Sequence, residues 1–220
     1  SGTIANVTTT VTASQGAGYT TISKVNAQFS NGVEDSTSNL TKSATEISDD
    51  LTAITNDNGA ALITISDSAY DGTNNDTSVL ATRLSAIGAS TTGTVTVSNA
   101  IKIAGSQSDV TAALVTESSK VSAGSASVTI SDATYDATNN DVSMNASDLS
   151  AIGNATTGTV TLTNLQRITG TQSDVTAALV TEASKVVAGT DNTIANVTDA
   201  VSAAQGKAIA AVSNIAAAFS

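Results

Sequence analysis

Two short acidic loops carry the residues best suited to bind a metal ion. They read DGTNND from Asp71 to Asp76 and DATNND from Asp136 to Asp141, and each follows an ISD tripeptide that ends at Asp67 or Asp132. Clustered carboxylate and amide oxygens suit Ca²⁺, although the bidentate glutamate and the regular spacing of an EF-hand are missing. The alternative is a plain turn in which Asp and Asn side chains bond to nearby backbone. The candidate calcium ligands are Asp67, Asp71, Asp76, Asp132, Asp136 and Asp141.

Catalytic groups are scarce in this chain. It has no histidine and no cysteine, which excludes a Ser-His-Asp triad, thiolate or histidine zinc sites and a cysteine nucleophile. Two serine–lysine pairs remain, Ser119–Lys120 and Ser184–Lys185, but adjacent residues on a helix point in different directions, so we expect surface residues there. The sequence therefore predicts no catalytic residue, and no cofactor other than the candidate calcium.

Charge and composition restrict the partners. Eight basic and nineteen acidic residues give a net charge of −11, which repels nucleic acid and anionic lipid. No apolar run is long enough for a membrane span. Aromatic residues make up only 2% of the chain, so the core must consist of Val, Ile, Leu and Ala, which suit thin, regular layers.

The two acidic loops lie at equivalent positions of an internal duplication. Residues 63–124 align without a gap with residues 128–189, at an offset of about 65 residues and with roughly two thirds identity. Alternating β-branched runs predict a strand at SVTIS, residues 127–131, and another at TVTLT, residues 159–163, with equivalents in the first copy.

Helices are predicted after capping sequences within each copy. Ser106 with Asp109, and Thr171 with Asp174, have the spacing in which a hydroxyl and an acid satisfy the first turn of a helix. Each copy thus reads strand-helix-strand-helix. A short amphipathic helix cannot bury its apolar face alone, so we expect a mixed α and β fold in which two tandem β/α repeat units stack in a solenoid-like way.

The two ends of the chain also resemble each other. TIANVTTTVTASQG at residues 3–16 matches TIANVTDAVSAAQG at residues 193–206, about 190 residues later. Apolar residues in both segments step by three and four, which predicts amphipathic helices at both termini, with one or two long helices in the first 55 or so residues. We expect their apolar faces to mediate assembly. These residues are Ile4, Val7, Val11, Ile22, Val25, Phe29, Ile194, Val197, Val201, Ile209, Val212, Ile215 and Phe219.

The expected organisation has four parts. They are an N-terminal helical region at 1–58, repeat units at 59–125 and 126–190, and a C-terminal helix at 191–220 that resembles residues 1–30.

The sequence DLSAIGNATTGTVTLTNLQRITGTQSDVTAALVTEASKV, residues 148–186, resembles the tandem units of very large Thr/Ala/Asp-rich secreted and cell-surface proteins of bacteria, notably marine cyanobacteria. The resemblance covers residues 63–189. It implies an extracellular or cell-surface location and a structural or adhesive role. In layout alone, predicted helical ends around a β-containing middle are similar to flagellin-type filament subunits.

These features favour a non-enzymatic extracellular structural protein. We expect it to assemble with copies of itself or with neighbouring repeats into a cell-surface filament, layer or array. The alternative is a binding module, either a calcium-dependent adhesin or a phage-fibre segment that contacts glycans or a cell surface.

Overall fold

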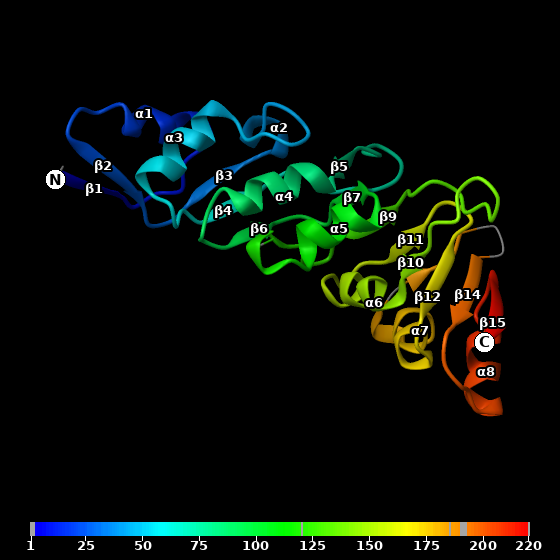
Figure 1. The fold of residues 1–220 in the computed structure, drawn as a ribbon. Helices are drawn as coiled ribbons and strands as arrows, with labels where there is room; N and C mark the ends of the chain where they lie inside the picture. The colour runs from blue at the N-terminus through cyan, green and yellow to red at the C-terminus, as the bar shows by residue number, and fades with distance from the viewer. Residues whose placement is uncertain (1–2, 120, 185, 190–192, 220) are drawn as a thin grey trace. The chain divides into compact units, whose positions relative to one another are not determined.

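The protein has a mixed α and β structure (Figure 1), which confirms the predicted fold class at that level. The computed structural model describes residues 3–119, 121–184, 186–189 and 193–219. Two compact units are present, one formed by Ser1–Lys102 with Ala112–Ser125 and the other by Ile103–Thr111 with Ala126–Ser220. The finer division into four parts stays a prediction.

The two copies of the duplication contain the same elements in the same order. The first contains β4 (Ile63–Ile65), β5 (Ser78–Leu80), α4 (Ala81–Ala89), β6 (Val95–Val97), β7 (Lys102–Gly105), α5 (Gln107–Leu114), the 3-10 helix η1 (Glu117–Ser119) and β8 (Val121–Ser122). The second contains β9 (Ser127–Ile130), β10 (Met144–Asn145), α6 (Ala146–Asn154), β11 (Val160–Leu162), β12 (Arg167–Gly170), α7 (Gln172–Leu179), η2 (Glu182–Ser184) and β13 (Val186–Val187).

The strands of both copies pair in parallel and in equivalent registers. β6 lies between β4 and β8, with Val95 aligned to Ile63 and to Val121. β11 lies between β9 and β13 in the same manner. Ile63 and Ile65 are buried whereas Thr64 is half-buried, as the alternation of a pleated strand requires. Parallel neighbours need a crossover connection, which the intervening helices supply.

The helices bury one face each. α4 buries Leu84, Ile87 and Gly88, and α6 buries the three equivalent residues, a spacing of three and four that matches the helical repeat. α7 begins as predicted, because the Thr171 hydroxyl accepts from the N–H of Asp174 while the Asp174 carboxylate accepts from the N–H of Thr171. The predicted capping sequence is thus confirmed.

The two ends of the chain form a second pair of matching segments. The N-terminal elements are β1 (Thr3–Val7), α1 (Ala13–Thr20), β2 (Val25–Phe29), β3 (Val33–Asp35), α2 (Thr37–Leu40) and α3 (Asp49–Asp57). The C-terminal elements are β14 (Thr193–Val197), α8 (Ala203–Ala210) and β15 (Ile215–Phe219). We call β1-α1-β2 the N-terminal module and β14-α8-β15 the C-terminal module. Each places a non-glycine residue in the left-handed region just before its second strand, Lys24 at φ 62° and Asn214 at φ 63°.

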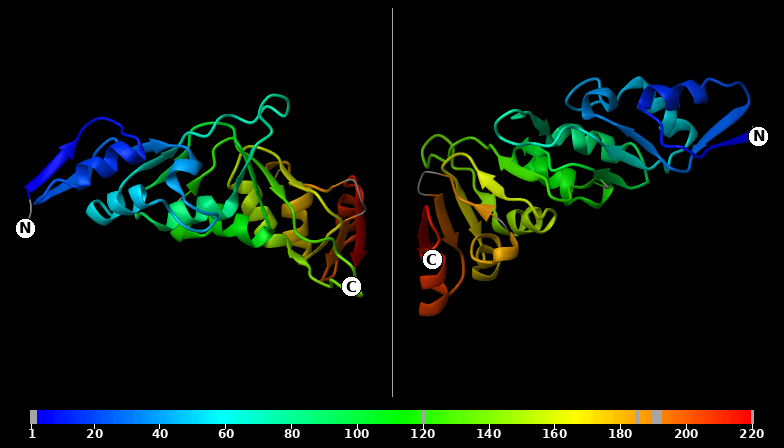
Figure 2. Two further views of the ribbon diagram at one scale, coloured as in Figure 1. Left: turned by 90° about the horizontal axis from the view of Figure 1, so that it is seen from above. Right: turned by 180° about the vertical axis from the view of Figure 1, so that it is seen from behind.

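The two modules differ in their neighbours. The C-terminal module belongs to a parallel sheet of order β10-β12-β14-β15, so β14 has a strand on each side (Figure 1). In the N-terminal module, at the blue end of the ribbon in Figure 2, β1 and β2 form a two-stranded sheet, and no other strand among the described residues pairs with β1.

One short helix forms at each terminus, α1 and α8, but the prediction of amphipathic helices is wrong for the flanking segments, which are strands. In β14 the first, third and fifth residues are buried and the two between them are half-buried, which is the period of a strand. Apolar side chains three apart share one face of a helix but lie on opposite faces of a strand, so their spacing suggested a helix. β-branched Thr, Ile and Val favour the strand that the structure shows. Helix forms only where a cap starts it, after Thr12 in α1 and after Ser202 in α8.

The region 1–58 is likewise not made of one or two long helices. It alternates short strands with three short helices among the residues described. In this region Leu51 and Ile54, three residues apart, do form the buried face of a helix, α3. No helix in the described stretches has the length and apolar character to cross a membrane.

Candidate functional site

Two of the candidate calcium ligands cap helices that lie earlier in the chain. Asp67 follows β4, and its carboxylate accepts a hydrogen bond at 2.8 Å from the backbone N–H of Thr37, the first residue of α2. Asp132 follows β9 and accepts at 2.7 Å from Gln107, the first residue of α5. The first N–H groups of a helix have no partner within the helix and carry partial positive charge, so a carboxylate suits this position.

The same contact recurs outside the duplication. Asp35, at the end of β3, accepts from the first N–H of α1 at 3.1 Å, and Asp199, after β14, accepts from the first N–H of α7 at 2.6 Å. The carboxylate and the amide are 22 to 30 residues apart in all four cases. A strand with its following helix is one layer here, and an aspartate of a later layer therefore fixes the helix of an earlier one. We call these four contacts the interlayer caps.

Asp71 and Asp136 organise their own loops. Asp71 Oδ1 accepts from the backbone N–H groups of residues 73–75 at 2.6 to 3.0 Å. Asp136 accepts from the backbone N–H of Thr138 at 2.9 Å and from the side-chain amide of Asn139 at 2.7 Å. These donors stabilise the charged carboxylates. The N–H groups, that of Asn75 first, hold the pKa of Asp71 well below 3.8, and the Asn139 amide lowers the pKa of Asp136.

These two loops should therefore keep their structure in mild acid. A carboxylate whose pKa is lowered by folding contributes stability above its unfolded pKa and loses that contribution as the pH falls through the folded value. We expect carbon-detected NMR titration to give midpoints below 3.8 for both aspartates. Asn139→Ala should raise the pKa of Asp136 and leave that of Asp71 unchanged. A midpoint at or above 3.8 in the unvaried chain would contradict this assignment.

Asp76 and Asp141 form ion pairs that close the loops onto neighbouring strands. Asp76 lies 3.4 Å from the ammonium of Lys102 in β7, and the same ammonium lies 4.9 Å from the ring centre of Tyr70. In the second copy, Arg167 in β12 contacts Asp141 at 2.8 Å and lies 4.9 Å from the equivalent tyrosine ring. Cation and ring attract each other in this geometry.

The six candidate calcium ligands thus have three separate kinds of partner, helix N–H groups, loop N–H groups and basic side chains. No group of three or more acidic side chains that could hold a metal ion is present in the part of the chain that the structure describes. Calcium binding by these loops stays a prediction.

The serine–lysine pairs are described only in part. Ser119 is buried, and its hydroxyl donates to the carbonyl of Thr116 at 2.8 Å. The expectation of a surface residue is wrong at this position, because η1, which Ser119 ends, packs against α4. Lys120, Lys185 and the side chain of Ser184 lie outside the described residues.

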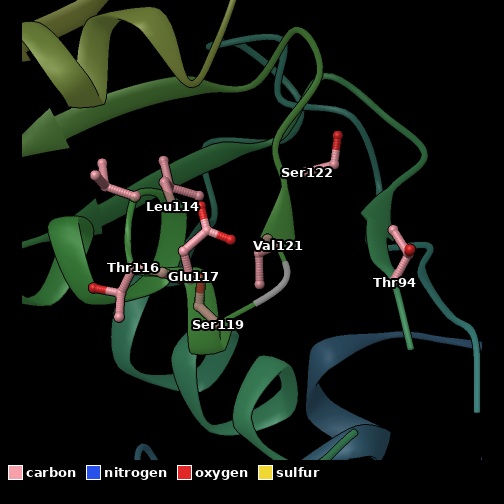
Figure 3. Close-up of a pocket in the computed structure, with 8 residues that line it drawn as sticks. Thr94, Leu114, Thr116, Glu117, Ser119, Val121 and Ser122 are labelled. Carbon is pink, nitrogen blue, oxygen red and sulfur yellow. The ribbon is translucent and has the colours of Figure 1, made fainter. Parts of the chain in front are cut away.

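A shallow pocket recurs at the same place in each copy. The first has a volume of about 240 Å³, and Figure 3 shows Leu114 and Glu117 on one side of it and Thr94 on the other. The second, of about 200 Å³, is lined by the equivalent residues, with Glu182 in place of Glu117. Among the described residues, the lining of each pocket is aliphatic and hydroxyl-bearing with one carboxylate.

The apolar residues predicted to form terminal stripes do not share one face. Ile209 lies in a helix, and the others lie in strands, turns or loops. The buried members are Val11, Phe29, Val197 and Ile209, and the most exposed are Ile4 at 70%, Ile22 at 49% and Phe219 at 45%. The N-terminal module thus exposes Ile4, whereas the C-terminal module exposes Phe219.

Sequence reasoning missed the interlayer caps, although a signal was present. An acidic residue ends VED, ISD, ISD and VTD, at or just after the ends of four strands. The structure thus shows a repeated set of structural contacts, together with exposed apolar side chains, Ile4 and Phe219, in the two terminal modules. Comparison with protein-family models, with curated proteins and with solved structures gave no match for this chain.

Proposed function

We propose that this chain is a non-enzymatic structural protein of the cell surface or the extracellular space. Its β/α layers stack as a solenoid-like array, and it assembles with copies of itself or with neighbouring repeats. The observation that carries this proposal is the interlayer cap, present four times with the same chemistry. Each layer completes the hydrogen bonding of another, as nearest neighbours do in repeat proteins.

Composition and sequence support the same role. Without histidine and cysteine, the commonest general base and the thiolate nucleophile are unavailable. The described residues that line the repeated pockets include one carboxylate in each. The resemblance of residues 63–189 to tandem units of large bacterial surface proteins supports the location.

The exposed apolar side chains of the two terminal modules supply the surfaces for assembly. An exposed large apolar side chain forgoes on the order of 1.5 to 3 kcal/mol relative to full burial. Ile4 at one end and Phe219 at the other are both exposed, so a contact that covers them is favourable. A contact between two different ends does not close on itself and propagates as a filament or layer.

The double variant Ile215→Asp, Phe219→Asp tests this proposal. The unvaried chain should form polymers that grow with concentration, and the variant should remain monomeric, because two carboxylates cannot be buried unpaired in an apolar contact. In the described part of the chain β14 is the one strand that pairs with β15, so the duplicated units should stay folded. Sedimentation velocity measures the polymers, and circular dichroism measures the fold.

Val142→Asp is the matched control, because Val142 is 68% exposed in the loop before β10 and lies at neither end of the chain. It should leave polymer formation unchanged. Polymers of the double variant would refute assembly through the C-terminal end. If the unvaried chain stays monomeric but melts at a higher temperature in calcium than in chelator, the calcium-dependent adhesin becomes the better interpretation.

A further inference from the structure

The pentapeptide TIANV occurs twice in this chain in two different environments. In β14 Thr193, Ala195 and Val197 are all 0% exposed. In β1 the equivalent residues are exposed or half-buried, and Ile4 is 70% exposed. Because the sequence is identical, the difference comes from what lies beside each strand.

The cover over β14 is the layer formed by β12 and α7. The backbone N–H of Ile194 donates to the carbonyl of Gln166 at 2.8 Å, at the start of the parallel pairing of β12 with β14. α7 packs on β14. In α8, Gln205 donates from its side-chain amide to the side chain of Gln172 in α7 at 2.8 Å.

The N-terminal module reproduces the local structure that receives this layer. The N–H of Thr3 donates to the carbonyl of Lys24 at 2.8 Å, and the N–H of Thr193 donates to that of Asn214 at the same distance. Alternate residues of a strand direct their N–H groups to opposite sides. The N–H of Ile4 therefore points away from β2, as that of Ile194 points to β12.

The helix of the N-terminal module, α1, also has the same local structure as its counterpart α8. Gln15 occupies the place of Gln205 and makes the same capping box, with Thr12 in place of Ser202. Beyond β1 no described strand continues the sheet. The module thus has a strand edge that no described strand covers. Its helix holds Gln15 in the same capping box that holds Gln205 beside Gln172.

We propose that the outer edge of β1 binds the β12–α7 layer of another repeat unit of the kind formed by residues 126–189. This inference rests on the proposed function and names the partner of one exposed end. The incoming strand runs parallel to β1 and accepts from the N–H of Ile4, and Gln15 contacts the residue equivalent to Gln172. Of the residues that bond to the β12–α7 layer in the C-terminal module, Asp199, which caps α7, is replaced by Thr9, whose hydroxyl is also a helix-capping acceptor.

An exposed strand edge also favours pairing with a second copy of itself. The β12–α7 layer is the better occupant because the same five residues already have that neighbour within this chain.

The experiment adds a second copy of residues 126–192 in front of Thr3 of the full chain, so that the junction repeats the one before Thr193. Amide hydrogen exchange is followed by NMR. In the unextended chain the amides of Ile4 and Asn6 should exchange fast and that of Ile194 slowly. In the extended chain both should slow by about 100-fold or more, toward the rate of Ile194, because they become part of a sheet interior.

The extended chain with Ile4→Pro is the matched control, because proline removes the outward N–H that the new strand needs. In it the amide of Asn6 should exchange as fast as in the unextended chain. Unchanged exchange at Ile4 and Asn6 in the extended chain, with the added unit itself protected, would overturn the inference. So would dimers of the unextended chain in which Ile4 is already protected. Protection of Ile4 in a chain that never polymerises would support the inference and count against the proposed assembly.

Discussion

Gly88→Ala is expected to destabilise the first copy of the duplication by about 3 kcal/mol or more, because the added methyl group has no space and the neighbour is backbone. A Cβ atom at Gly88 would lie 1.5 Å from the carbonyl oxygen of Ser119 and 2.4 Å from its carbonyl carbon. α4 would have to move away from η1, and Leu84 and Ile87 on its buried face would move with it. Urea denaturation measures the loss.

Gly18→Ala is the matched control for this substitution. Gly18 lies in α1, and a Cβ atom there meets nothing within 4 Å, so the change should stabilise by about 0.5 to 1 kcal/mol through helix propensity alone. The close approach of α4 to η1 would be refuted if Gly88→Ala unfolded at the same urea concentration as the unvaried chain. A loss in both variants would indicate instead a general intolerance of the helices.

The duplicated units could be predicted from sequence because their local signals agree with their packing. The alternation in SVTIS and TVTLT predicts strands at β9 and β11, where they are found. The capping sequence before α7 and the buried residues Val175 and Leu179 follow from spacing in the same way. In each of these segments the spacing of apolar residues fits either the two-residue period of a strand or the 3.6-residue period of a helix, but not both.

The terminal segments could not be assigned because their signal was ambiguous. Thr193 to Val197 is too short for the helical and strand periods to be distinguished by its two large apolar residues, Ile194 and Val197. Ile194 proves to be half-buried while Ala195 and Val197 are buried. Pairing with β12, which supplies the second ladder of hydrogen bonds, stabilises this segment as a strand.

The interlayer caps could not be predicted from local sequence patterns, for a different reason. Asp67 and Asp132 sit in sequences that also fit turns and calcium loops. Their acceptor role depends on a helix N-terminus 25 to 30 residues earlier in the chain, and no periodicity within one loop reveals such a partner. Only the recurrence of an acidic residue at the ends of strands pointed to a shared structural role.

The identical pentapeptides of β1 and β14 allow one substitution to be compared at a covered and an uncovered strand. Ile194 donates its N–H to the carbonyl of Gln166, and Gln166 as a residue is 2% exposed. Proline at 194 removes that donor and leaves a buried carbonyl unpaired. The same change at Ile4 removes an N–H that points away from β2, on an edge where proline is tolerated.

Ile194→Pro is therefore expected to lower the free energy of unfolding by about 2 to 4 kcal/mol, from the lost hydrogen bond and the unpaired carbonyl together, whereas Ile4→Pro should change it by no more than about 0.5 kcal/mol. Urea denaturation of both variants measures the difference, and amide exchange at Ala195 and Val197 shows whether the C-terminal module has separated from β12. Equal losses in the two variants would mean that β1 is already covered at its outer edge in the isolated chain. Equal and negligible losses would mean that β12 does not hold β14 in solution, and the layered pairing on which assembly depends would then be wrong.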